Sequence, residues 1–426
     1  MVQQGGTGKR IAVVGAGISG ICTAYLLQKQ HRVTLFEKNE YFGGHTHTVA
    51  VPDGPDEGTF VDTGFIVLNE RTYPNLLRFF HRLGVAVEPT DMSFSYYCPE
   101  TGVCFGSRNL NALFARRINL FNPVYWRFVY EIPRFLKGLR ARYLEGKLED
   151  ITLEEYMAGH GYHRQLAEWF VVPMAAAIWS ASDFTIRQFP VRTFAQFYEN
   201  HGLLSVAGHP PWYFVKGGSH SYVKAFLNEF TGEAVKNCVV HNIQRESNRV
   251  RIRFDSRGDE YFDAVVMAAH ADEALAMLED PDDKEKRLLG AWSYSRNPTV
   301  LHTDVSVMPP LKAAWSSWNY TRQKKSGEMS PVTVSYDMNR LQKIRSRKPL
   351  FVSLNPVHDI PPEHRIKEMV YTHPQYSFEA FATQEELPGL NGRRNTYFCG
   401  SYFGYGFHED GVNAALSVTR HFGVEL

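Results

Sequence analysis

Three glycines near the start of the chain have the spacing of a turn that binds a dinucleotide. They lie in the stretch Gly15-Ala16-Gly17-Ile18-Ser19-Gly20. In such a turn the first glycine makes the tight bend, the second lets the backbone approach a pyrophosphate, and the third lets a helix pack closely on a strand. The N–H groups at the start of that helix then face the phosphates. We expect all six residues to line a dinucleotide site.

The sequence around this turn supplies the strands and the helix that such a site needs. An apolar run ends at Val14, residues 21–27 have a helical pattern, and a second apolar run covers residues 32–36. Glu37 follows at once, at about the position where an acid that binds the ribose is expected. We therefore predict that Glu37 and the adjacent Lys38 also contact the cofactor, and we favour this interpretation over a glycine turn without a ligand.

The composition limits the classes of protein to which the chain can belong. It has 426 residues, 44% of them hydrophobic, which is enough for two domains. Lys and Arg number 46 against 45 Asp and Glu, and no recognition motif accompanies them, so we expect no nucleic-acid partner. Five scattered cysteines predict neither a disulfide framework nor a zinc site and fit a reducing cytoplasm. We expect no signal peptide or membrane-spanning run.

Three further segments carry a pattern of glycines and polar residues. They are residues 38–48, with Gly43-Gly44-His45-Thr46-His47-Thr48; residues 59–69, with Asp62-Thr63-Gly64; and residues 395–416, with a glycine-rich loop before Gly411. Lys216-Gly217-Gly218 and the apolar runs at 238–243 and 262–270 complete the set. The set resembles the flavin-dependent amine oxidase superfamily, which includes monoamine oxidases, protoporphyrinogen oxidases and phytoene desaturases. The resemblance implies an α/β fold, with a Rossmann-type FAD-binding domain and a discontinuous α+β substrate domain, and it implies FAD as the cofactor.

The same resemblance implies where the FAD contacts lie beyond the glycine turn. The glycine pair matches one that follows the ribose acid in the superfamily, and residues 238–243 match the strand whose backbone holds the adenine end. A helix that begins near Gly411 would direct its N–H groups at another part of the cofactor. The further residues implied are Gly43, Gly44, His45, Thr46, Val239, Val240, Gly400, Ser401, Asp410, Gly411 and Val412.

Several positions depart from the superfamily pattern. Phe42 and His45 stand where arginines usually flank the glycine pair, and Ser401 follows Gly400 where an acid is usual. Residues 294–303 include no lysine, although the amine-oxidising members carry one near the flavin N5, and this disfavours an amine substrate. The whole pattern is most similar to a bacterial subgroup found alongside cyclopropane-fatty-acid-synthase-like methyltransferases. Some of its members desaturate methylated acyl chains on the way to furan fatty acids.

Polar residues of the C-terminal loop are the candidates for catalysis. A flavin accepts a hydride at N5 and a second hydrogen must leave as a proton, so desaturation benefits from a general base. His408 is our first candidate for a catalytic or substrate-positioning role, and Glu409 is the second. The alternative is that Glu409 and Asp410 hold the ribityl chain or cap the next helix. His45 and His47 are expected to hydrogen-bond the cofactor, and we expect no metal because their pattern lacks a third ligand.

Residues 108–147, here called the basic aromatic segment, have a distinct composition. They contain nine basic residues against two acids, with eight aromatic residues interleaved. Pro123 and Pro133 are expected to divide the segment into short helices. A basic, aromatic and amphipathic segment is typical of a surface that lies on an anionic membrane. The alternative is a solvated helical face whose aromatic residues belong to an ordinary core.

We predict two domains, each assembled from separate stretches of the chain. The FAD-binding domain takes residues 1–85, 208–290 and 391–426, and the substrate domain takes residues 86–207 and 291–390. The expected function is FAD-dependent desaturation of a membrane-lipid acyl chain, including methyl-branched chains, by a cytoplasmic protein that lies on the inner face of the membrane. Two rivals stay open. One is a flavin amine oxidase, and the other is a flavin-containing accessory protein bound to a lipid methyltransferase.

Overall fold

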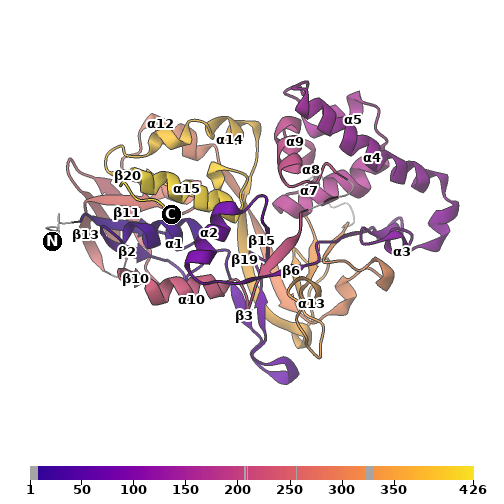
Figure 1. Ribbon diagram of the computed structural model, residues 1–426, viewed down its shortest axis with the longest axis horizontal. Helices are drawn as coiled ribbons and strands as arrows, with labels where there is room; N and C mark the ends of the chain where they lie inside the picture. The colour runs from indigo at the N-terminus through magenta and orange to yellow at the C-terminus, as the bar shows by residue number, and fades with distance from the viewer. Residues whose placement is uncertain (1–7, 206–207, 209, 256, 323–330) are drawn as a thin grey trace.

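The computed structural model describes residues 8–205, 208, 210–255, 257–322 and 331–426. One part of the molecule is built on a five-stranded parallel sheet (Figure 1). Its strands, in their order across the sheet, are β10 (Glu233–Val235), β2 (Arg32–Phe36), β1 (Arg10–Val14), β14 (Ala264–Met267) and β20 (Thr396–Phe398). β14 is buried at every position, as expected of a parallel strand that is covered on both faces.

Different layers cover the two faces of this sheet. Ile11 and Val13 of β1 belong to the core that includes α1 (Ile18–Leu27) and α15 (His408–Arg420). Ala12 and Val14 point to the opposite core, because successive side chains of a strand alternate between faces. That opposite face meets an antiparallel sheet and two short helices. They are β11 (Val240–Arg245), β12 (Val250–Phe254), β13 (Gly258–Phe262), α11 (Ala271–Met277) and α12 (Asp283–Gly290).

A second, seven-stranded sheet lies beside the first part of the molecule (Figure 1). Its longest pair is antiparallel, so that Ser293 to His302 of one strand run opposite Gln375 to Arg365 of the other. The strands, in order across the sheet, are β19 (Arg365–Gln375), β15 (Ser293–His302), β18 (Phe351–Leu354), β17 (Val334–Asp337), β16 (Trp318–Thr321), β7 (Phe94–Tyr97) and β8 (Cys104–Gly106). A mixed α/β architecture with one parallel and one largely antiparallel sheet confirms the predicted fold class.

A group of helices packs against the seven-stranded sheet and lies above it in the view of Figure 1. It contains α4 (Pro123–Leu144), α5 (Leu153–Gly159), α6 (Arg164–Leu166), a π-helical turn (Ala167–Val171), α7 (Val172–Trp179), α8 (Asp183–Arg187) and α9 (Val191–Asn200). Our expectation that two prolines would divide the basic aromatic segment is wrong for one of them. Pro123 begins α4, but Pro133 lies inside it. The helix continues because Phe135, Leu136 and Leu139 keep its apolar face in the core.

Small elements connect the two sheets. They are β3 (Thr48–Ala50) with β4 (Phe60–Asp62), and β5 (Val67–Asn69), β9 (Trp212–Val215) and β6 (Val87–Thr90). Helices α2 (Pro74–Arg82), α3 (Leu110–Leu113), α10 (His220–Glu229), α13 (Met338–Leu341) and α14 (Phe378–Thr383) complete the chain. Asp62 ties these connections together, because its buried carboxylate accepts hydrogen bonds from Ser219 N, Thr48 Oγ1 and Gln342 Nε2.

The parallel sheet draws its strands from three separate stretches of sequence. They lie between residues 10 and 36, between 233 and 267, and between 396 and 398. The seven-stranded sheet takes its strands from residues 94–106 and 293–375. The exact domain boundaries stay a prediction. In the part of the chain that the structure describes, no helix is both long and apolar enough to span a bilayer.

Candidate active site

The glycine turn between β1 and α1 has a tight geometry. Gly15 has φ +101°, in the region that glycine favours. A Cβ placed on Gly20 would lie 1.9 Å from the Gly15 carbonyl oxygen, so only glycine lets α1 approach the turn this closely. A Cβ on Gly17 would meet no atom within 4 Å, and no described side chain caps α1 there. The start of α1 therefore keeps its N–H groups for a ligand.

The glycine pair at residues 43 and 44 packs directly on this turn. Gly43 N donates to the Ala16 carbonyl oxygen over 2.8 Å. A Cβ on Gly44 would lie 3.2 Å from Gly17 Cα. Glycines that are distant in sequence therefore form one backbone surface without side chains, on which an extended anionic ligand can lie closely.

Glu37 lies at the end of β2 beside the same turn and is only 5% exposed. Its carboxylate accepts hydrogen bonds from Ala16 N at 2.9 Å and from Asn39 N at 2.9 Å. Cys238 N donates to the Glu37 carbonyl oxygen, also at 2.9 Å. The predicted contacts at residues 239–240 follow directly, so the structure brings them to the acid and to the glycine turn.

The start of α15 closes another side of the turn. A Cβ on Gly411 would lie 2.7 Å from Ser19 Oγ and 2.9 Å from Ile18 Cγ2, so α15 and α1 are in contact where they begin. Asp410 accepts a hydrogen bond from Phe407 N at 2.9 Å. Burial raises the pKa of Asp410 to about 7. Asp410 therefore caps its own helix, which is one of the two roles that we set against catalysis.

The glycine turn at residues 15–20, the glycine pair and the start of α15 form one surface, here called the cradle. The remaining predicted contacts lie around it. Gly400 and Ser401 follow Cys399 at the end of β20, whose carboxyl end is at the same sheet edge as those of β14 and β1. Val412 is fully buried in α15. Lys38 is different, because its Nζ lies 2.5 Å from Glu273 Oε1 in an exposed ion pair. The structure thus gives Lys38 a protein partner at the margin of the cradle.

His408 is held in a defined orientation at the start of α15. Its ring stacks on Phe65, and its Nε2 lies 2.9 Å from Thr46 Oγ1. Thr46 Oγ1 also contacts Tyr222 Oη at 2.7 Å. Burial, together with the neighbouring His45, lowers the pKa of His408 to about 3. His408 is therefore neutral near pH 7, and its Nε2 is already engaged with Thr46.

Glu409, our second candidate for catalysis, contacts the start of another helix in the structure. Its two carboxylate oxygens accept hydrogen bonds from Asn75 N at 3.0 Å and Leu76 N at 2.8 Å. These are free N–H groups at the start of α2, where the N-cap residue Tyr73 provides no side-chain cap. A carboxylate at this end of a helix also interacts favourably with the helix dipole. Glu409 therefore caps α2 from another element.

Three half-buried histidines meet where the cradle touches the seven-stranded sheet. The ring centroid of His45 lies 5.2 Å from that of His373 and 6.2 Å from that of His270. Burial and the neighbouring His270 lower the pKa of His45 to about 4, and burial also lowers the pKa of His373. The buried Nε2 of His45 has no hydrogen-bond partner among the described residues. This nitrogen of a neutral imidazole is thus available to a ligand.

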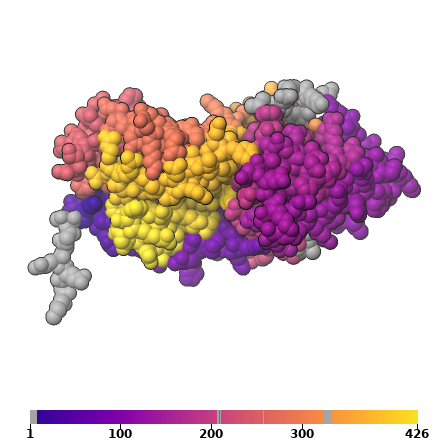
Figure 2. Space-filling model, turned by 90° about the horizontal axis from the view of Figure 1, so that it is seen from above, coloured from indigo at the N-terminus to yellow at the C-terminus, as the bar shows by residue number. Residues whose placement is uncertain are grey.

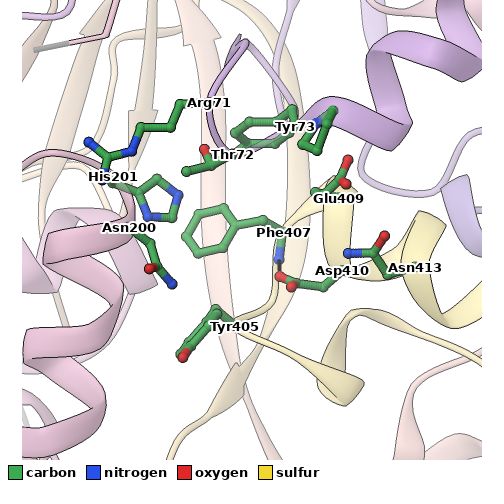
Figure 3. Close-up of a pocket in the computed structure, with 11 residues that line it drawn as sticks. Arg71, Thr72, Tyr73, Asn200, His201, Tyr405, Phe407, Glu409, Asp410 and Asn413 are labelled. Atoms are coloured by element: carbon green, nitrogen blue, oxygen red, sulfur yellow. Dashed lines mark hydrogen bonds between the residues drawn. The ribbon is translucent and has the colours of Figure 1, made fainter.

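A cleft of about 340 Å³ opens beside the start of α15 (Figure 3). Figure 3 shows the Phe407 ring directed toward His201, and their ring centroids are 5.9 Å apart. Burial lowers the pKa of His201 to about 4, so this side chain is neutral near pH 7. The cleft is lined by Arg71, Thr72, Tyr73, Pro74, Asn200, His201, Tyr405, Phe407, Glu409, Asp410 and Asn413.

A comparison with protein families decides the assignment of this cradle. The family of flavin containing amine oxidoreductases matches residues 18–370. This chain belongs to that family. The family match shows an FAD-dependent oxidoreductase, and the match ends before α15, so the roles of the residues in α15 rest on the geometry above.

Known proteins of several activities resemble the chain. A fatty acid isomerase from P. acnes that produces CLA has a TM-score of 0.65 and 18% identity, covering 97% of this chain and 99% of that one. Cyclohexylamine oxidase from Brevibacterium oxydans IH-35A has a TM-score of 0.68 and 14% identity, covering 98% and 100%. An L-amino acid oxidase from Cerastes cerastes is 39% identical over 71 residues, 16% of this chain and 13% of that relative. At these identities the structures show a shared fold.

The cradle fits the FAD that the family requires. The uncapped start of α1 and the open space at Gly17 suit a pyrophosphate, and Glu37 lies where a ribose hydroxyl would be bound. The unpartnered Nε2 of His45 offers one more hydrogen-bonding atom. These residues surround one glycine-rich surface, which supports the FAD contacts predicted there.

Sequence reasoning missed several residues of this site. His270 could have been found, because it follows a parallel strand at the sheet edge where ligands bind. His373 carried no signal, since only the pairing of β15 with β19 brings it to His45. Phe65 and Tyr222 also gave no signal, because their contacts with His408 and Thr46 depend on the tertiary fold.

Proposed function

We propose that this FAD-dependent oxidoreductase desaturates an acyl chain of a membrane lipid, including chains that carry a methyl branch, as in furan fatty acid synthesis. A lipid methyltransferase would supply such a methylated chain and is the proposed partner. The observation that carries the proposal is the nature of the surface beside the C-terminal loop. That surface is aromatic, and its carboxylates are committed to backbone N–H groups.

The aromatic surface joins the cofactor side to the helices of the other part of the molecule. Phe407 stacks on Phe197 of α9, with ring centroids 5.2 Å apart, and Tyr405 meets the same ring at 5.6 Å. Glu409 and Asp410 line the cleft, but both accept backbone hydrogen bonds. Contact with such a surface lowers the free energy of a hydrocarbon chain, whereas an amine cation finds no uncommitted carboxylate among Glu409 and Asp410.

The proposed chemistry divides between the cofactor and the protein. FAD, when bound, accepts a hydride from the acyl chain. A proton must leave the neighbouring carbon for a base beside the flavin. We assign His408 to positioning, because its hydrogen bond with Thr46 orients both side chains. The sequence has one Gly-x-Gly-x-x-Gly turn, so we expect reoxidation by dioxygen or another acceptor and not by a bound nicotinamide.

A flavin amine oxidase is the rival that the family itself favours. The family takes its name from amine oxidation, and cyclohexylamine oxidase shares the fold. Against this rival, β15 contains Arg296 but no lysine. A flavin-containing accessory protein of the methyltransferase is the other rival, and it would use the same cofactor site without turnover.

Anaerobic mixing of the FAD-loaded protein with candidate substrates tests the proposal. We expect dispersed phospholipid with methyl-branched chains to bleach the flavin absorbance, and mass analysis to show acyl chains that have lost two hydrogens. The same phospholipid with unbranched chains is the matched control for the branch.

Bleaching by a polyamine or an aryl amine, with none by lipid, would reverse the choice in favour of an amine oxidase. A protein that holds FAD, is reduced by neither class and co-purifies stoichiometrically with a lipid methyltransferase would be the accessory subunit.

A further inference from the structure

The basic aromatic segment exposes an unusual amount of apolar surface. Sixteen large hydrophobic side chains are exposed in the part of the chain that the structure describes, and eight of them lie between residues 110 and 144. Phe121 is 87% exposed and Ile118 is 66% exposed. Concentrated exposure of this kind marks a binding surface, whereas scattered apolar residues do not. The eight are Leu110, Ile118, Leu120, Phe121, Val124, Trp126, Tyr130 and Leu144.

These side chains stand on a rigid framework. Asn122 caps α4 by accepting a hydrogen bond from Val124 N at 3.0 Å. Trp126 Nε1 donates to the Leu120 carbonyl oxygen at 2.9 Å and thereby joins the helix to the turn before it. Tyr125 is buried and donates its hydroxyl to the Leu113 carbonyl oxygen at 2.5 Å. The apolar residues are therefore held outward by ordered structure. Their contact with water in the free protein is unfavourable in free energy.

One face of α4 carries aromatic, apolar and basic residues together. Trp126, Tyr130, Lys137 and Leu144 are exposed, and their spacings of four and seven place them on the same side of a helix. The opposite face is buried in the core through residues that include Phe128, Phe135 and Leu139. Tryptophan and tyrosine prefer the region between water and hydrocarbon, where one end of the ring is apolar and the other is wet.

The segment is strongly positive, whereas the other residues of the chain together carry a net negative charge. Nine basic residues against two acids give +7 for residues 108–147, whereas 46 basic against 45 acidic residues give +1 for the whole chain. All nine basic side chains are exposed. Both acids are paired, since Glu131 is buried against Arg127 and Arg134 and Glu145 meets Lys147. The segment therefore presents a net positive surface at the end of the molecule opposite the N-terminus (Figures 1 and 2).

We propose that this surface, formed by the eight exposed apolar residues and their basic neighbours, docks on an anionic lipid bilayer with Phe121 and Ile118 inserted. The positive charge complements anionic headgroups, and protruding apolar side chains enter the boundary between headgroups and acyl chains. Figure 2 shows the segment as a tapered end, which offers little of the broad area that a stable protein partner needs. The docking adds a location to the proposed function. That the bilayer is the source of the substrate rests on the proposed function.

Vesicle flotation of the full-length, FAD-loaded protein tests the docking. We expect binding to vesicles of phosphatidylcholine mixed with phosphatidylglycerol, weaker binding to phosphatidylcholine alone, and weakening by salt. Phe121→Ser should reduce the partition coefficient by about tenfold or more. Phe378→Ser, at another exposed phenylalanine (43% exposed), is the matched control and should bind normally.

Charge variants test the electrostatic part separately. Lys137→Gln with Arg142→Gln should weaken binding to anionic vesicles by about tenfold or more. Lys343→Gln with Arg345→Gln removes two exposed charges outside the segment and should leave binding unchanged. All five native cysteines are buried, so a single Phe121→Cys variant can carry an environment-sensitive fluorophore, whose emission should shift to the blue on binding.

The docking is overturned if the wild-type protein ignores anionic vesicles, or if the segment variants bind as the controls do. The proposed function is tested independently of the docking, because flavin reduction is measured with detergent-dispersed lipid and needs no vesicle. Phe121→Ser should keep its rate of flavin reduction on dispersed lipid while losing vesicle binding. A wild-type protein that binds vesicles but is never reduced by lipid would retain the docking and remove the desaturase.

Discussion

The imidazole of His408 lies flat on the ring of Phe65, with ring centroids 3.7 Å apart and 16° between the planes. This contact joins the first residue of α15 to the segment that follows β4. The same imidazole reaches Thr46, two residues after the glycine pair. One neutral side chain thus fixes the relative position of three parts of the cofactor cradle.

His408→Gln should slow flavin reduction by about tenfold while FAD remains bound. Glutamine can keep a hydrogen bond with Thr46 but loses the stack on Phe65, and a hydrogen bond or an aromatic pair contributes about 1 kcal/mol. Stopped-flow reduction and an FAD-binding titration measure the two effects. Since its pKa is about 3, His408 should add no ionisation to the rate profile between pH 5 and 8. An inflection in that range that disappears in the variant would show a titrating base.

Glu409→Ala should destabilise the fold by about 1 kcal/mol, the usual cost of losing a helix cap. Its carboxylate serves Asn75 N and Leu76 N, and α2 has no other side-chain cap among the described residues. Denaturant unfolding measures the change. The rate of flavin reduction should stay near that of the wild type. A large loss of rate at unchanged stability and FAD content would restore the catalytic role.

Gly17→Ala and Gly20→Ala should differ in their effect on the stability of the protein without cofactor. A Cβ at Gly17 meets no atom within 4 Å, so the variant should fold with an unchanged melting temperature but bind FAD at least about tenfold more weakly. A Cβ at Gly20 collides with the Gly15 carbonyl oxygen, so this variant should lose several kcal/mol of stability, as about 1–3 kcal/mol or more is usual for overpacking. Thermal unfolding and flavin fluorescence titration separate the two. Equal FAD affinity in Gly17→Ala and wild type would contradict the pyrophosphate assignment.

His302 should make the fold sensitive to acid. Burial lowers its pKa to about 4, from about 6.5 in an unfolded chain. Between these values the unfolded chain binds a proton at this histidine that the folded protein does not. The contribution of His302 to the free energy of unfolding is therefore fully present above pH 6.5 and is lost as the pH drops toward 4. The slope from this group is about 1.4 kcal/mol per pH unit. His302→Gln should remove that slope from urea midpoints measured against pH.

Ser353→Ala is the control for this prediction. It removes the hydroxyl that lies 2.8 Å from His302 Nε2 but keeps the histidine. The variant should therefore be less stable at every pH and still show the wild-type dependence on acid. An unchanged slope in His302→Gln would mean that this histidine does not titrate between folded and unfolded states.

Local patterns in the sequence were sufficient wherever one element defines a site. Gly15, Gly17, Gly20 and Glu37 lie within one strand–turn–helix–strand unit, and its chemistry depends on spacing along the chain. The same reasoning failed at Pro133, because the loss of one backbone hydrogen bond was outweighed by the burial of an apolar face that continues through the helix.

Roles that depend on contacts between distant residues could not be read from spacing. Glu409 was equally suited to catalysis and to capping until the fold placed it against α2, 333 positions from Leu76. His45, His270 and His373 form a cluster only because β15 and β19 pair and carry His373 to the cradle.

The sequence by itself determined the cofactor turn, the α/β class and the oxidoreductase family, because each follows from residue types at short, fixed separations. The tertiary structure alone decided which polar groups are free and which are committed. A carboxylate or imidazole has the same chemistry in the sequence whatever surrounds it, whereas its protonation and its free hydrogen-bonding atoms are set by neighbours that only folding brings within reach.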